Sequence, residues 1–375
     1  MYVVDVFAVW GGLERVWTDK MNALSSIHGY EVCLVTTDQG AHQVPYPLSP
    51  RVRHMDIGIY LTHQYRYHGV RRWWMKWHLT RLFRDRFKAL LTLEKPDILI
   101  TTASEFSVLV SKWKGDIPLV IECHGLFERP VHMQRMTLLK RVKTRSIRRS
   151  ISMAQIVVAL TQQDARQWKN INMCSVAIPN IVHLNESGQL STCQNHRIIF
   201  VGRPDEQKGY CYLKEIWQIV CQQYPDWELH LYGEGLDTID FCDMLPSGEQ
   251  VFVHPQTLAI HACYQESAIL VLTSVYEPFG LVMPEAMSCG IPVVAFNCPY
   301  GPSEIITDGV DGFLIPPFDV EFFAERLSDL MADEALRKQM GQKAGVSSQR
   351  YSCERIIPQW TTLFEQLKRK EYGLV

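Results

Sequence analysis

Short apolar runs rich in β-branched residues alternate with longer helical patterns along the whole chain, and they fall into two series. The candidate strands of the first series cover 3–9, 31–37, 97–102, 118–123 and 154–160. Those of the second series cover 197–202, 227–233, 250–254, 268–274 and 291–296. Strands that alternate with helices form parallel sheets covered by helices. The pattern therefore predicts two doubly wound α/β domains.

A polar stretch at 183–195 separates the two series and is expected to be a linker. It divides the chain of 375 residues into an N-terminal domain over 1–182 and a C-terminal domain over 196–354. Each domain is long enough to bury a hydrophobic core of its own.

Composition excludes several other classes of protein. Hydrophobic residues make up 47% and charged residues 21%, which is typical of a folded globular chain and not of a disordered one. We expect no transmembrane helix and no signal peptide. The 11 cysteines include no C-x-x-C pair, which indicates reduced thiols and not a zinc ribbon or a disulfide framework. These features predict a cytoplasmic protein.

The charge is distributed unevenly between the two halves. Residues 1–170 hold 25 Lys and Arg against 14 Asp and Glu, whereas residues 171–375 hold 13 against 26. Such asymmetry suggests two domains that face different partners. No recognised nucleic-acid motif accompanies the basic half, so no nucleic acid is expected among the partners.

Open parallel sheets bind their ligands beyond the carboxyl ends of the strands, so the loops there are the first place to look for chemistry. Gly11 and Gly12 follow the first strand, where they allow close approach of an anion or simply a tight turn. His124 follows the 118–123 strand, where it is either a ligand group or a structural histidine.

The second domain opens with a strand that runs into Gly202 and Arg203, and Lys208 follows five residues later. Two fixed cations beyond one strand suit a diphosphate, because arginine offers a planar fork and lysine a point charge. The alternative is a pair of solvated surface charges, but this half of the chain has few cations.

The segment 274–296 places Glu277 before a turn and Glu285 in a helix expected to begin at Leu281. The two carboxylates can reach different parts of one ligand, and the helix start can hold a phosphate. The alternative is that both are ordinary carboxylates favoured near a helix N-terminus.

These motifs together resemble the retaining family 4 glycosyltransferases with the GT-B fold, of the kind that build bacterial surface polysaccharides. The two glutamates with seven residues between them match the signature of that family. Further matches follow in the family's order, namely GGLERV, ECHG, IPN at 178–180, GRPDEQKG, LYGEG at 231–235 and DGVDGFLIPP at 308–317. The resemblance covers nearly the whole chain and is closer in the C-terminal half.

The resemblance implies two Rossmann-like domains that face each other across a cleft. It also implies that the last helix, about 355–371, packs back on the N-terminal domain. The expected reaction moves a sugar from a nucleotide diphosphate sugar, UDP favoured over GDP, to a saccharide or lipid-linked saccharide with retention of configuration.

The family's roles are carried over to the matching positions of this chain. Four residues would be catalytic, namely Arg203, Lys208, Glu277 and His124. Donor binding would involve Gly11, Gly12, Gly202, Arg203, Lys208, Gly233, Glu277, Phe279, Gly280, Leu281, Val282 and Glu285. Glu285 would bind the ribose, and the base would lie near Gly233.

No metal or other cofactor is expected, because the chain lacks a D-x-D motif and its cations can stabilise the leaving diphosphate. No carboxylate clearly serves as a covalent nucleophile. Alternatives with the same fold are a sugar-nucleotide epimerase, a phosphorylase or an inactive transferase-like partner protein. An NAD-dependent oxidoreductase is disfavoured, since the G-x-G-x-x-G fingerprint is absent.

A basic, tryptophan-containing segment suggests where the protein works. Residues 61–90 hold eight Lys and Arg with Trp73, Trp74 and Trp77, and residues 135–149 add seven more cations. Such a segment suits peripheral binding to an anionic membrane surface at the cytoplasmic face. The alternative is a solvated basic face with the tryptophans buried in the core.

Overall fold

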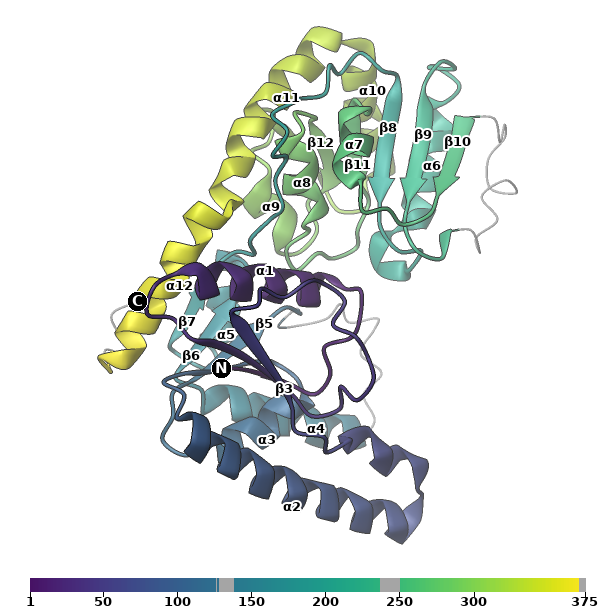
Figure 1. The fold of residues 1–375 in the computed structure, drawn as a ribbon. Helices are drawn as coiled ribbons and strands as arrows, with labels where there is room; N and C mark the ends of the chain where they lie inside the picture. The colour runs from purple at the N-terminus through teal and green to yellow at the C-terminus, as the bar shows by residue number, and fades with distance from the viewer. Residues whose placement is uncertain (126, 128–137, 237–249, 371–375) are drawn as a thin grey trace. The chain divides into compact units, whose positions relative to one another are not determined.

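The computed structural model describes residues 1–125, 127, 138–236 and 250–370. The chain forms two compact units, one made of Met1–Ile181 with Ile356–Val375 and the other of Val182–Arg355 (Figure 1). Each unit holds one parallel sheet, as the alternating pattern predicts.

The sheet of the first unit has seven parallel strands in the order β3-β2-β1-β4-β5-β6-β7. The strands are β1 (Tyr2–Val4), β2 (Val32–Thr36), β3 (Val52–Asp56), β4 (Leu99–Thr102), β5 (Leu119–Cys123), β6 (Ile156–Ala159) and β7 (Ser175–Ala177). The helices are α1 (Gly12–Ser26), α2 (Gly69–Glu94), α3 (Glu105–Trp113), α4 (Leu138–Ser152), α5 (Gln162–Trp168) and α12 (Cys353–Lys368), with the 3₁₀ turn η1 (Leu61–Arg66).

The sheet of the second unit has six parallel strands in the order β10-β9-β8-β11-β12-β13. The strands are β8 (Arg197–Val201), β9 (Glu228–Tyr232), β10 (Val251–His254), β11 (Ile269–Leu272), β12 (Val293–Phe296) and β13 (Gly312–Ile315). The helices are α6 (Tyr210–Val220), α7 (Ile260–Gln265), α8 (Val282–Ser288), α9 (Gly301–Ile305), α10 (Val320–Ala332) and α11 (Glu334–Ser348), with the turns η3 (Glu206–Lys208) and η7 (Gln349–Tyr351).

All ten strands expected from the sequence are present, and β3, β7 and β13 are additional. The strand β3 has no apolar run because three of its five residues are exposed at the edge of the sheet. The strand β1 is shorter than expected and ends at Val4. Beyond it, the Gln39 side chain accepts from the Phe7 amide at 2.9 Å and donates to the Phe7 carbonyl at 3.0 Å, in place of a neighbouring strand.

The helix α12 belongs to the first unit from Ile356 onward. Six apolar residues at helical spacing are all buried, namely Ile356, Ile357, Trp360, Leu363, Phe364 and Leu367. Phe364 meets the Tyr30 ring at 6.3 Å, which fixes the helix beside the turn that follows α1. The apolar spacing that suggested packing on the N-terminal domain thus marks the buried face of this helix.

The polar stretch 183–195, expected as a linker, packs on the second unit. The Asn185 amide donates to Ser288 Oγ at 2.9 Å, and the Ser191 amide donates to the Cys289 carbonyl at 2.7 Å. Its Cys193 is buried. Most residues of the stretch are exposed, so it lies on the surface of the second unit and is held there by these backbone hydrogen bonds.

Candidate active site

The loop after β8 is fixed against the end of β11. Asp205 caps η3 by accepting from the Lys208 amide at 3.2 Å, and Thr273 Oγ1 donates to the Lys208 carbonyl at 3.0 Å. Gly209 has φ +63°, and a Cβ there would lie 2.1 Å from the Thr273 carbonyl oxygen. Only glycine allows this close approach, which holds the backbone beside Lys208 in place.

Lys208 and Glu277 form the centre of the site. Lys208 Nζ lies 2.8 Å from Glu277 Oε2, and their side chains are only 14% and 8% exposed. Ser274, which follows β11, donates from Oγ to the same carboxylate oxygen at 3.2 Å. The structure therefore brings together two of the predicted catalytic residues, which are 69 positions apart, and adds Ser274, which sequence reasoning missed.

A turn packs directly on the Glu277 side chain. Gly280 has φ +89°, and a Cβ there would lie 2.8 Å from Glu277 Cγ. Phe279 is buried against the Tyr351 ring, with centroids 5.3 Å apart. The Gly301 amide donates to the Glu277 carbonyl at 2.8 Å, so both the main chain and the side chain of Glu277 are held.

The helix α8 follows this turn, with Leu281 at its N-cap and Val282 as its first residue. The sequence places its start at Leu281, one residue earlier. Glu285 lies in the first turn of α8 and is 4% exposed, close to the 6% of Glu277. Both glutamates of the motif are thus buried carboxylates, which is uncommon for ordinary helix-start residues.

Arg203 differs from Lys208 in its surroundings. Its side chain is 71% exposed and lies 3.5 Å from Asp205 Oδ2. The preceding residue, Gly202, donates from its amide to the Tyr232 carbonyl at 3.0 Å. The ends of β8 and β9 are therefore adjacent, and this adjacency brings Gly233 beside the same loop.

In the first unit, Gly11 and Gly12 begin α1. Gly11 is the N-cap and donates to the Val9 carbonyl at 2.8 Å, which makes the turn tight. The Glu14 carboxylate lies over this turn, because its Oε2 is 2.8 Å from the position of a Gly11 Cβ. Burial raises the pKa of Glu14. The turn therefore already has a carboxylate beside it, which the sequence motif alone does not reveal.

His124 is held by a buried carboxylate at the end of β5. Its Nε2 lies 3.1 Å from Glu122 Oε2, and Trp17 Nε1 donates to that same oxygen at 3.1 Å. Lys20 Nζ donates to the other oxygen, Oε1, at 2.5 Å. Burial opposes ionisation of Glu122, but the charge of Lys20 and the hydrogen bond from His124 lower its pKa to about 2.

The Lys20 ammonium lies between this carboxylate and an aromatic ring of α12. Its Nζ is 3.7 Å from the centroid of the Trp360 ring, a cation–π contact inside the protein. Burial lowers the pKa of Lys20, while Glu122 opposes that change. Sequence reasoning missed both charges of this pair, although a glutamate inside the apolar run 118–123 was a visible signal.

A cavity of about 450 Å³ lies beyond the carboxyl ends of β2 and β3 in the first unit. Asp38 shapes it by accepting from the Leu61 and Thr62 amides at 2.8 and 3.0 Å. Tyr60 and His63 stack with centroids 5.1 Å apart, and Arg66 completes the wall. An aromatic platform with polar groups and a cation around it can bind a polar organic ligand.

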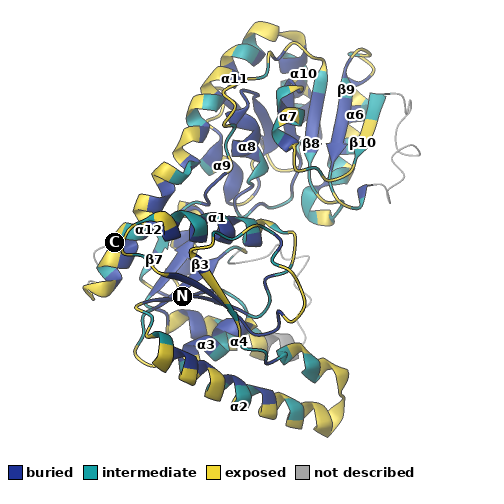
Figure 2. Cartoon of the chain, viewed as in Figure 1, coloured by how far each residue is buried: buried dark blue, intermediate teal, exposed yellow. Residues whose placement is uncertain are grey.

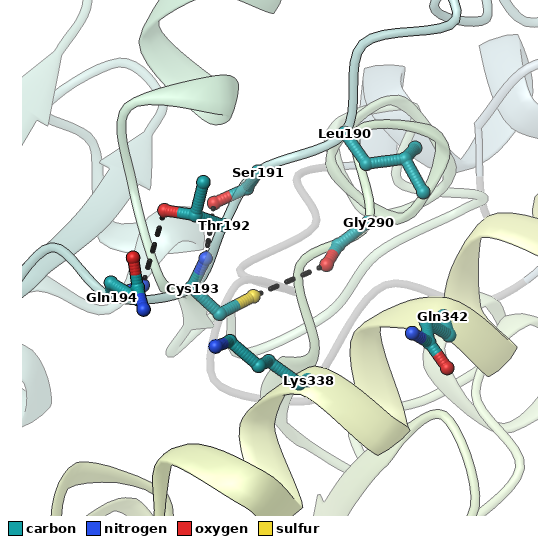
Figure 3. A pocket seen from close by; sticks show the side chains of 8 residues that line it. All are labelled: Leu190, Ser191, Thr192, Cys193, Gln194, Gly290, Lys338 and Gln342. Carbon is teal, nitrogen blue, oxygen red and sulfur yellow. Dashed lines mark hydrogen bonds between the residues drawn. The ribbon is translucent and has the colours of Figure 1, made fainter.

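Figure 3 shows another cavity, of about 310 Å³, in the second unit. It lies between the 190–194 segment and Lys338 and Gln342 of α11, and Cys193 Sγ donates across it to the Gly290 carbonyl at 3.4 Å. None of the predicted donor-binding residues lines it, so we do not assign the donor there. Among the residues that the structure describes, no group of three His, Cys, Asp or Glu is placed to hold a metal ion.

Two family models match the chain nearly from end to end. Glycosyltransferase Family 4 matches residues 10–186, and Glycosyl transferases group 1 matches residues 189–345. An uncharacterized glycosyltransferase of Haemophilus influenzae is 28% identical over 93% of this chain and 95% of its own length. The chain is a family 4-like glycosyltransferase with the GT-B fold.

Another relative of this glycosyltransferase is the amylovoran biosynthesis glycosyltransferase AmsD of Erwinia amylovora. It is 26% identical over 97% of this chain and 98% of its own length. Among solved structures, Anabaena HepE in complex with UDP-glucose has a TM-score of 0.73 at 18% identity, covering 98% of this chain and 100% of its own. The group 1 match of the glycosyltransferase contains Lys208, Glu277 and Glu285, and the family 4 match contains His124.

Proposed function

We propose that this glycosyltransferase moves a sugar from a UDP-sugar to a saccharide acceptor, with retention of configuration and without a metal ion or other cofactor. The observation that carries the proposal is the ion pair between the half-buried Lys208 and the buried Glu277, at 2.8 Å, on a loop held beyond a strand end. The complex of HepE with UDP-glucose supports the choice of UDP as the nucleotide.

In the proposed reaction, cleavage of the sugar–phosphate bond leaves negative charge on the UDP diphosphate. The Lys208 ammonium is already held at the site by Glu277, so it stabilises that charge with little reorganisation. Arg203 is largely exposed and free to fold over the bound phosphates. The backbone of Phe279, Gly280 and Leu281 holds the donor, and Glu285 binds the ribose hydroxyls.

Retention follows from attack on the same face of the sugar from which UDP departs. The bond from the anomeric carbon to the phosphate oxygen breaks, and the bond to the acceptor oxygen forms. The acceptor proton passes to the departing phosphate. A covalent route would need a carboxylate nucleophile, and Glu277 Oε2 is engaged by both Lys208 and Ser274.

His124 is proposed to contact the transferring sugar. Because Glu122 is ionised, it can only accept, so His124 Nε2 carries the hydrogen of their 3.1 Å hydrogen bond. In the neutral ring, Nδ1 is then the acceptor and can receive a sugar hydroxyl. The Glu122 carboxylate therefore selects the tautomer of His124.

The acceptor is proposed to be a saccharide or a lipid-linked saccharide, held at the 450 Å³ cavity lined by Tyr60, His63 and Arg66. The relative named for amylovoran biosynthesis supports a polysaccharide pathway. We propose that the enzyme works in the cytoplasm, peripherally on the inner face of the membrane. None of the helices in the described ranges is long and apolar enough to cross a membrane.

Nucleotide binding tests the donor part of the proposal. Calorimetric titration with UDP and GDP, in buffer with EDTA, should show tighter binding of UDP. Lys208→Ala should weaken UDP binding at least tenfold, whereas Lys343→Ala, which removes an exposed cation of α11, should leave it unchanged. Equal affinity for both nucleotides would refute the UDP assignment, and binding only with added Mg²⁺ or Mn²⁺ would refute metal independence.

A further inference from the structure

The helix α2 carries two apolar stripes that face different directions. Its buried residues are Leu79, Phe83, Phe87, Leu90 and Leu91, which all lie in its C-terminal part and face the core. A second stripe occupies the N-terminal part at the spacing i, i+3, i+4, i+7, and consists of Val70, Trp73, Trp74 and Trp77. At about 100° per residue, the centre of this second stripe lies about 120° around the helix from the centre of the first.

The second stripe lies on the protein surface. Val70 is 82% exposed, and the rings of Trp73, Trp74 and Trp77 are 69%, 53% and 51% exposed. The first turns of α2 are largely exposed, as Figure 2 shows. The alternative that these tryptophans belong to the domain core is therefore wrong. Burying indole rings is strongly favourable, so three exposed in one stripe indicate a contact surface.

Cations lie among the residues of the stripe, and this part of the sequence has no acid. The sequence has no Asp or Glu from residue 57 to residue 84, while Arg71, Arg72 and Lys76 lie among the tryptophans. All three cations are exposed. The Arg72 guanidinium lies 4.8 Å from the centroid of the Tyr65 ring, so aromatic and cationic groups form one surface that continues into η1.

We propose that this stripe is the membrane contact of the enzyme, and that its indole rings insert at the headgroup level of an anionic bilayer. Tryptophan rings prefer the bilayer interface, and lysine and arginine attract the headgroup phosphates. The proposal deepens the proposed function, because it names the surface that meets a lipid-linked acceptor. The cavity lined by Tyr60, His63 and Arg66 adjoins it, since η1 packs on α2.

The surface makes two separable contributions to binding, electrostatic attraction and ring insertion. Loss of three cations should lower partitioning onto anionic vesicles about a hundredfold, because each such residue contributes roughly a factor of five near the surface. Loss of the three indoles should lower partitioning also at high salt, where the electrostatic attraction is screened.

The test is flotation of the full-length protein with vesicles of phosphatidylglycerol and phosphatidylcholine, against vesicles of phosphatidylcholine alone. The wild type should float with the anionic vesicles at low salt, and the triple variant Trp73→Ala, Trp74→Ala, Trp77→Ala should float much less at both low and high salt. Leu93→Ala removes an exposed apolar residue at the far end of the same helix and should float like the wild type. Circular dichroism should show that all variants are folded, since the changed residues are exposed.

A charge-matched comparison tests the cations. Reversal of Arg71, Arg72 and Lys76 to Glu should abolish flotation, whereas reversal of Arg51, Arg166 and Lys169 to Glu changes the net charge equally and should not. Failure of the wild type to float, equal flotation of all variants, or self-association through the stripe in place of vesicle binding would overturn the inference. Stabilisation of the same variants by UDP in a thermal shift assay tests the donor site separately.

Discussion

The buried Lys20–Glu122 pair allows a quantitative prediction about the stability of the first unit. The pKa of Glu122 falls from 4.5 to about 2 in the folded protein. At 1.36 kcal/mol for each pKa unit, this corresponds to about 3 kcal/mol in favour of the ionised carboxylate. Removal of one partner of a buried pair typically costs about 3–5 kcal/mol, because the other charge stays buried. Glu122→Gln and Lys20→Met should each lower the free energy of unfolding of the first unit by about 3–5 kcal/mol.

Hydrogen–deuterium exchange of the β5 amides measures the opening free energy of the first unit, and the β11 amides of the second unit serve as an internal control. The double variant Lys20→Met, Glu122→Gln should lose much less unfolding free energy than the two single variants lose in sum, since it leaves no unpaired charge. The free energy of unfolding of the wild type should exceed that of Glu122→Gln by the full amount above pH 4.5. This difference should vanish as the pH falls toward about 2, because Glu122 is then protonated in the folded protein too. Additive losses, or a single-variant cost below about 1 kcal/mol, would refute the reasoning.

Further predictions concern the second unit. Gly209→Ala should lower kcat about a hundredfold, because its Cβ would meet the Thr273 carbonyl and displace Lys208. Gly188→Ala is the matched control, since Gly188 has a similar φ of +69° but no neighbour within 4 Å. If both variants lost the same activity, displacement of Lys208 would not be the cause. Burial lowers the pKa values of His230 and His254, which lie in β9 and β10, below their ordinary value of 6.5. The second unit should therefore lose stability as the pH falls below 6.5, which exchange at β9 amides would detect, and a constant exchange rate between pH 7.5 and pH 5.5 would contradict this.

Strand periodicity predicts most of the fold and points to the candidate site, because buried parallel strands are continuous apolar runs and their carboxyl ends carry ligand groups. The pairing of Lys208 with Glu277 could not be predicted, since it depends on how the loops after β8 and β11 meet. Nor does the sequence indicate the partner of Lys20, because Glu122 is 102 residues away and the ion pair is made only in the packed core.

For the tryptophans of α2, the sequence favours exposure on a basic surface but leaves burial in the core as the alternative. The two apolar stripes of α2 lie about 120° apart around the helix, so periodicity alone does not show which of them faces the core. Only the packing of Leu79, Phe83 and Phe87 shows which side faces the core and leaves Trp73 and Trp77 exposed.

We propose that this glycosyltransferase transfers a sugar from a UDP-sugar, with retention, through the Lys208–Glu277 site. The most direct measurement is proton NMR of the product formed from a UDP-sugar and a lipid-linked acceptor in the presence of EDTA. The wild type should release UDP and give a new glycosidic linkage with the anomeric configuration of the donor, and Lys208→Ala should lower the rate by about two orders of magnitude. An inverted product, or a free epimerised sugar formed without any acceptor, would contradict the proposed reaction.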